Sequence, residues 1–220
     1  MKKNWWKILC VVLILFSLVA GLLIPVPDLP IIHQSIRNLF FHVGMWFAML
    51  VIFTISFIYS IRYLSGFKTD NDIVAQEASK VGVFFGILGI ATGMIWAKFT
   101  WGSWWVNDPK LNGAAVSLLV YFAYLVLRNS LNEEQKRAKV SAVYNIFAYV
   151  LLIVFIGILP RLAQGSIHPG DVNNPLTVKT MDNHLRLVFY PAIIGWILLA
   201  VWILNLRIKI CKIEHKMNTL

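Results

Sequence analysis

The chain has 220 residues, of which 59% are hydrophobic and only 14% are charged. Soluble domains have about 45–50% apolar and about 25% charged residues, so a water-soluble globule of this size cannot hide so much apolar side chain. Two cysteines exclude a disulfide scaffold, and 14% aromatic residues exclude a disordered or fibrous chain. The formal charge of +10 lies in short segments between apolar runs, so we expect no nucleic-acid partner. The remaining class is a polytopic membrane protein.

Six apolar stretches are long enough, or nearly so, to cross a hydrocarbon core of about 30 Å as helices. Only helices satisfy their own backbone groups in lipid as single segments, so we expect an all-α bundle that forms one integral-membrane domain over residues 1–220. The first stretch is followed by Pro25 and Pro27 rather than by a small-residue cleavage site, and we therefore expect a retained helix instead of a signal peptide. The expected spans are 6–24, 43–63, 81–99, 113–127, 140–159 and 185–206.

Four glycines of the third span recur every three or four residues, at Gly82, Gly86, Gly89 and Gly93. This spacing puts them on one face of a helix, where a neighbouring helix can approach closely. We interpret the glycine face as a packing surface.

The distribution of basic residues predicts the orientation. Fourteen of the 20 Lys and Arg residues fall on one side of the six spans, in the two terminal segments and in the loops that end the second and fourth spans. Because basic residues accumulate on the cytoplasmic side, both termini are expected in the cytoplasm. The opposite, outer side carries the longest connection, about Pro160–His184.

The outer end of the third span carries an unusual tryptophan segment, residues 101–111. Trp101, Trp104, Trp105 and Asp108 follow the spacing i, i+3, i+4 and i+7, which on a helix places them on one face. Tryptophan often anchors a helix at the membrane interface, but three within five residues, with Gly102 between them, exceed what anchoring requires. Such an aromatic strip suits a large flat apolar ligand such as a porphyrin.

Histidine is the second element of the outer side. His42 precedes the second span and His184 precedes the sixth, so both are expected at the depth of the tryptophan segment. One histidine from each of two helices could hold a haem iron from both sides. His33 and His168 lie among turn residues of the outer loops and are weaker candidates, and His215 lies in the basic tail.

Several chemistries have no motif in this chain. It lacks a phosphate-binding Gly-Lys-Ser/Thr loop, a Cys-x-x-Cys-His haem attachment site and a Cys-x-x-Cys redox pair. Neither a Ser/His/Asp set nor a pair of catalytic carboxylates is visible. We therefore expect a binding and transfer protein rather than an enzyme.

The segment from Trp101 to Asp108 resembles the tryptophan-rich "WWD" signature of the haem-handling membrane proteins of cytochrome c maturation. Six spans in about 220 residues, with one histidine before the second and one before the sixth, resemble the CcmC (haem exporter protein C) family within that group. The signature usually has Trp where this chain has Asn107 and Arg where it has Lys110. The resemblance covers essentially the whole chain.

The resemblance implies a function in the inner membrane, at its periplasmic face. A protein of this family presents non-covalently and transiently bound haem b to the haem chaperone CcmE, beside the ABC-type subunits CcmA and CcmB and the small subunit CcmD. His42 and His184 would be the axial ligands of the iron. The cofactor-binding set implied in this way is His42, His184, Trp101, Gly102, Trp104, Trp105, Asp108 and Lys110.

Three other functions remain as alternatives. A b-type membrane cytochrome, or another WWD-type assembly protein, would also bind haem through histidines; an electron carrier commonly buries both ligands within its bundle. A solute permease would usually show ionisable residues near mid-membrane, whereas the middles of all six apolar runs lack Asp, Glu, Lys and Arg.

Overall fold

The computed structural model describes residues 4–29, 31–163, 166–168 and 181–218, and within these ranges it is helical with no strand. Among the described residues, six helical segments are long and apolar enough to cross a membrane, which confirms the predicted all-α bundle of six spans. The helices are α1 (Trp5–Leu23), α2 (Leu39–Gly66), α3 (Thr69–Trp101), α4 (Pro109–Asn129), α5 (Glu134–Leu152), α6 (Leu159–Leu162) and α7 (Asn183–Asn218), with a 3₁₀ helix η1 (His33–Asn38) before α2 and a π-helical segment η2 (Ile153–Ile158) between α5 and α6.

Two helices are much longer than their apolar runs predicted. Helix α3 begins at Thr69, well before the expected residue 81, and α7 continues to Asn218, well beyond residue 206. Hydropathy marks the part of a helix that suits lipid, whereas the backbone hydrogen bonds continue into polar turns. At the start of α3, Asp70 and Asp72 also complement the positive end of the helix dipole.

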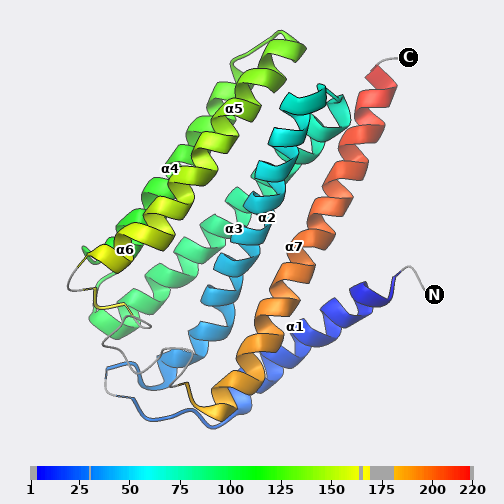
Figure 1. The fold of residues 1–220 in the computed structure, drawn as a ribbon. Helices are drawn as coiled ribbons and strands as arrows, with labels where there is room; N and C mark the ends of the chain where they lie inside the picture. The colour runs from blue at the N-terminus through cyan, green and yellow to red at the C-terminus, as the bar shows by residue number, and fades with distance from the viewer. Residues whose placement is uncertain (1–3, 30, 164–165, 169–180, 219–220) are drawn as a thin grey trace.

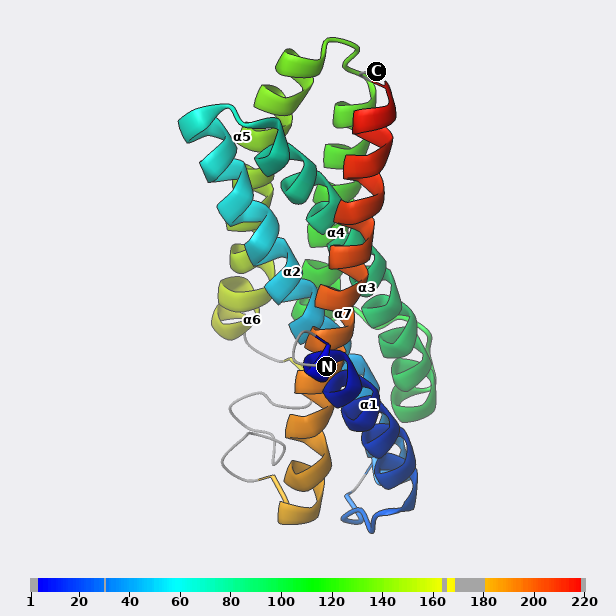
Figure 2. The ribbon, with the colours of Figure 1, turned by 90° about the vertical axis from the view of Figure 1, so that its right-hand side faces the viewer.

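The bundle has a central layer flanked on two sides. Helix α2 packs against α3, α5 and α7, the pair α4–α5 covers one side, and α1 packs against α7 on the other (Figure 1). In the side view of Figure 2, α1 lies in front of α7 and crosses it. We call the end of the bundle at Trp101, where α3 finishes, the tryptophan end, and the end at Thr69, where α3 starts, the basic end.

The glycine face of α3 receives side chains from α2. A Cβ atom added at Gly82 would lie 2.5 Å from the Phe53 ring, and one at Gly93 would lie 2.7 Å from Cε1 of His42. Gly86 and Gly89 similarly adjoin Met49 and Trp46. The receiving glycines and the inserted side chains of α2 share the same spacing of four, three and four residues. The predicted packing surface is confirmed, and its last position holds His42.

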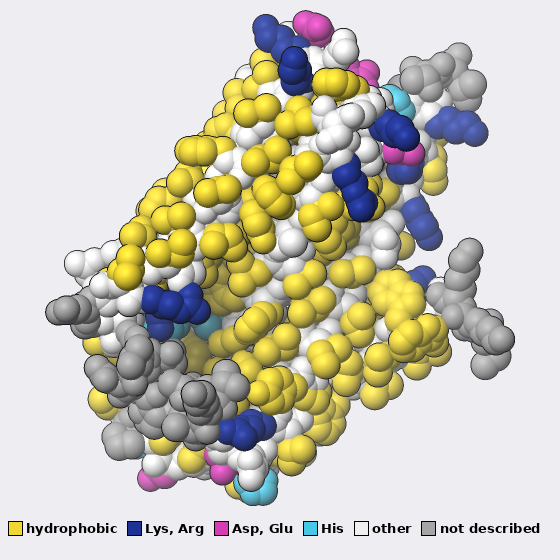
Figure 3. Space-filling model, in the orientation of Figure 1, with side chains coloured by type: hydrophobic (Ala, Val, Ile, Leu, Met, Phe, Trp, Pro, Cys, Tyr) yellow, Lys and Arg dark blue, Asp and Glu magenta, His cyan; other side chains and the backbone are white. Residues whose placement is uncertain are grey.

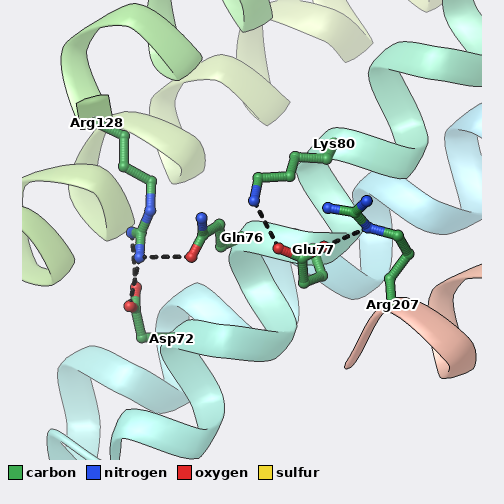
Figure 4. A network of polar contacts seen from close by, with 6 residues as sticks. All are labelled: Asp72, Gln76, Glu77, Lys80, Arg128 and Arg207. Carbon is green, nitrogen blue, oxygen red and sulfur yellow. Dashed lines mark hydrogen bonds and ion pairs between the residues drawn. The ribbon is translucent and has the colours of Figure 1, made fainter. Parts of the chain in front are cut away.

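Ion pairs connect the helices at the basic end (Figure 4). Arg128 of α4 donates to both carboxylate oxygens of Asp72 on α3, at 2.8 and 2.5 Å, and also to Gln76. Glu77 of α3 is buried and pairs with Lys80 and with Arg207 of α7. These contacts connect α3 to α4 and to α7 at the end opposite His42.

Candidate haem site

A cavity opens near the tryptophan end, between α2, α3, α4 and η2. Its volume is about 180 Å³, and it is partly open to solvent. The wall is almost entirely apolar or aromatic, with two histidines and one lysine. The lining residues are His42, Val43, Trp46, Gly89, Ile90, Gly93, Met94, Trp96, Trp101, Trp105, Lys110, Leu111, Ala114, Ile156 and His168.

His42 is held rigidly in the cavity wall. The side chain is only 5% exposed, and its ring lies edge-on to Trp46 and Trp96, with centroids 6.1 and 5.8 Å away. Its Nδ1 is 2.9 Å from the carbonyl oxygen of Gly89. A carbonyl can only accept, so we assign the hydrogen to Nδ1, which leaves the lone pair on Nε2. Metal-binding histidines commonly orient their ring by such a bond.

His168 lies opposite His42. The two ring centroids are 6.3 Å apart, and His168 is also 6.2 Å from Trp101. Bonds of about 2 Å from a metal to an imidazole nitrogen on each side place the two ring centres roughly 6 Å apart. The observed separation therefore fits two imidazoles that share one metal ion.

His184 does not line this cavity. It is exposed in the first turn of α7, where its backbone N–H donates to Oδ1 of Asp182. The sequence analysis paired His42 with His184 because both precede a span, yet the structure places His168 beside His42 instead. Sequence reasoning gave His168 little weight because it lies in a loop, and no local pattern signals which side of the loop faces the cavity.

The tryptophan segment is not one helical face, and that prediction is wrong for residues 102–108. Helix α3 ends at Trp101, and Gly102 follows with φ of +77°, a left-handed conformation that glycine adopts without steric cost. Asp108 then caps α4, with Pro109 at its first position. The glycine and proline that stop and start helices interrupt the spacing that the tryptophans would otherwise share.

Because the helix is interrupted after Trp101, the tryptophan side chains lie in two different environments. Trp101 and Trp105 line the cavity, whereas Trp104 is 53% exposed and does not line it. The indole N–H of Trp105 donates to Asn112, whose amide donates in turn to Asn107. Asn107, at the position where the WWD signature usually has Trp, thus takes part in the amide contacts that orient Trp105.

Asp108 and Lys110 also separate. Lys110 lines the cavity, whereas Gly102, which directly follows α3, is exposed and does not line it. Asp108 is only 1% exposed, and its carboxylate accepts hydrogen bonds from three protein groups. Of the predicted set, the structure gathers His42, Trp101, Trp105 and Lys110 around the cavity, with Asp108 behind its wall.

The mouth of the cavity has basic neighbours. Figure 3 shows histidine side chains in a hollow of the surface with Lys or Arg side chains at its edge, close to α6. Arg161 lies on α6, where its guanidinium donates to the carbonyl oxygen of Gly157. An apolar cavity with cationic side chains near its mouth suits a flat apolar ligand that carries negative groups on one edge.

Comparison with known proteins identifies the family of the chain. The family model described as "CcmC: Heme exporter protein C" matches residues 2–220. The chain belongs to the heme exporter protein C family. The family resemblance expected from the tryptophan segment and the six spans is thereby confirmed.

Individual relatives come from two kinds of assembly protein. The heme exporter protein C of Paracoccus denitrificans is 23% identical over 175 residues, which cover 80% of this chain and 72% of that protein. The cytochrome c biogenesis protein CcsA of Prochlorococcus marinus is 39% identical over 87 residues, and CcsA of a Synechococcus strain is 34% identical over 110 residues. The Prochlorococcus match covers 40% of this chain but only 27% of the relative, so the chain spans about a quarter of that longer protein.

Proposed function

We propose that this protein binds haem at the tryptophan end of its bundle and transfers it to the haem chaperone CcmE during the biogenesis of c-type cytochromes. Haem is the cargo in this proposal, held non-covalently and transiently as haem b. The observation that carries it is the pair of imidazoles, His42 and His168, 6.3 Å apart in one cavity lined by tryptophans. The family and its cytochrome c biogenesis relatives support the same reading.

Each part of the cavity wall would contribute one property. His42 and His168 would ligate the iron from its two sides, and the Nδ1–H bond of His42 to Gly89 leaves Nε2 as the nitrogen that would ligate. Trp101 and Trp105 offer aromatic faces to the porphyrin rings. Lys110, and the basic side chains near the mouth, would attract the propionates.

The membrane setting of the proposal is the bacterial inner membrane, with the cavity at the periplasmic face. The charge asymmetry of the loops supports this orientation. The proposed partners are CcmE, the ABC-type subunits CcmA and CcmB, and CcmD, in addition to membrane lipid. The alternative of a b-type cytochrome differs in one measurable respect, because an electron carrier keeps its haem.

Absorption spectroscopy of the purified protein tests the haem site. We expect a Soret band from haem-sufficient cells that falls sharply in His42→Ala and in His168→Ala. His184→Ala is the matched control, since its side chain is exposed and outside the cavity. Loss of the band in His184→Ala with an unchanged band in His168→Ala would instead support the pair expected from the sequence. Haem that stays on the protein when apo-CcmE is added would favour the cytochrome alternative.

A further inference from the structure

The Asp108 carboxylate connects two parts of the chain that are far apart in sequence. Its Oδ1 accepts from the backbone N–H of Lys110 at 2.8 Å, which caps α4. Its Oδ2 accepts from Oγ of Ser166 at 2.9 Å and from the backbone N–H of Ile167 at 3.0 Å. Hydrogen bonds to an ionised carboxylate are about twice as strong as those between neutral groups.

The segment that Oδ2 holds leads directly to His168. Ser166 and Ile167 precede this histidine, and the N–H of His168 donates to Oγ of Ser166 at 3.3 Å. Helix α6 ends at Leu162, so residues 166–168 lie outside any helix of their own. They are fixed instead to the first turn of α4, which packs against α5 and α3.

We propose that Asp108 is a positioning residue that sets the place of His168 opposite His42, and that it does not contact the cargo or a partner protein. This inference deepens the proposed function, since it rests on His168 as an iron ligand. Asp108 is only 1% exposed, and both of its carboxylate oxygens accept hydrogen bonds from the protein itself. A partner protein could therefore contact almost none of its surface. A ligand on an untethered loop would spend much of its time away from the iron, which weakens binding.

The two oxygens of Asp108 allow the capping and tethering functions to be separated. Asparagine and serine are both good N-caps, so Asp108→Asn and Asp108→Ser retain an acceptor for the N–H of Lys110. Neither supplies the second carboxylate oxygen that accepts from Ile167. Ser166→Ala removes one of the bonds to Asp108, and with it the acceptor of the His168 N–H, and leaves the cap untouched. Ser117→Ala is the matched control, because Ser117 also donates a hydrogen bond in α4, to Gly113, but lies away from residues 166–168.

Hydrogen exchange of the full-length, haem-free protein in nanodiscs tests the tether without any cargo. We expect the amide of Ile167 to exchange about 10-fold faster or more in Asp108→Asn and Asp108→Ser than in wild type, since a bond to a charged acceptor is lost. The amide of Asn112, which bonds to the Asp108 backbone, should stay protected and show that α4 is intact. Wild-type exchange at Ile167 in both variants would overturn the tether.

Titration with hemin tests the positioning itself. We expect wild type and Ser117→Ala to give the low-spin spectrum of two histidine ligands. Asp108→Ser should give the five-coordinate, high-spin spectrum that His168→Ala gives, and Ser166→Ala should shift part of the population toward it. A low-spin spectrum in Asp108→Ser with a loosened Ile167 amide would overturn the positioning function. Wild-type protein that takes up no hemin would contradict the proposed function, while the exchange experiment would still decide the tether.

Discussion

At the scale of single residues, the site depends on Gly93, which has no side chain, as much as on the side chains that line the cavity. His42 occupies the space that a Cβ atom at Gly93 would need. The histidine ring is enclosed by Trp46 and Trp96 on α2 and α3, so it has little room to move aside. The glycine is therefore part of the environment that orients the ring.

Gly93→Ala should disturb the site more than it disturbs the fold. The added methyl group would push His42 away from the carbonyl oxygen of Gly89, and we expect a severalfold fall in haem bound per folded protein. Gly82→Ala is the control, because it creates a similar clash on the same helix, with Phe53, but far from the cavity. It should lower the melting temperature while leaving the Soret absorbance per folded protein unchanged. Equal losses of haem in both variants would contradict this role of Gly93.

The tryptophans also differ in what they can contact. Trp101 faces the cavity, whereas Trp104 presents more than half of its surface to the exterior. Exposed aromatic residues of this kind often mark contacts with partner proteins.

We expect Trp101→Ala and Trp104→Ala to separate binding from transfer. Trp101→Ala should weaken haem binding, since it removes an aromatic face of the cavity. Trp104→Ala should bind haem normally and label the haem chaperone poorly. Haem content of the purified protein and covalent haem on the chaperone are the two measurements. Normal chaperone labelling in Trp104→Ala would argue against a docking role.

At the scale of elements, the end of α3 and the start of α4 decide which side chains meet. Gly102 stops one helix, and Asp108 with Pro109 starts the next. The intervening loop turns Trp105 back over the cavity and Trp104 outward. At the other end, Arg128 connects the same two helices through its buried pair with Asp72.

The Asp72–Arg128 pair should matter for stability and not for the cargo. Removing one partner of a buried ion pair typically costs about 3–5 kcal/mol, since it leaves the other charge uncompensated. We therefore expect Arg128→Met to lower the unfolding temperature markedly. The double variant Asp72→Leu with Arg128→Met should recover part of the loss, because no buried charge remains. Thermal unfolding in detergent measures both, and a double variant less stable than either single one would contradict this account.

At the scale of the whole molecule, the chain is a membrane bundle whose two ends differ in character. The tryptophan end carries the cavity, and the basic end carries the buried ion pairs and most of the Lys and Arg residues. The proposed function requires the cargo site to lie at the membrane face where the partner protein lies. The orientation of the bundle is therefore a functional property.

Cysteine labelling tests that orientation. In a background with Cys10 and Cys211 replaced by alanine, a membrane-impermeant maleimide should label Trp104→Cys in intact spheroplasts. Met217→Cys, at the exposed basic end of α7, should react only in inverted vesicles. The opposite pattern would reverse the predicted topology and remove the proposed periplasmic site.

Composition and hydropathy alone determined the class of this protein and its six spans, because these properties depend on local runs of residues. The family resemblance rested on the residues of the tryptophan segment. That resemblance placed His42, Trp101 and Trp105 in the expected haem-binding set, and the structure places all three in the cavity wall. Only the tertiary structure decided that His168 rather than His184 lies opposite His42, and that Asp108 binds the loop before His168. Those contacts join residues about 60 or more positions apart. Such pairings depend on how the helices pack and where loops fold back, which no local pattern encodes.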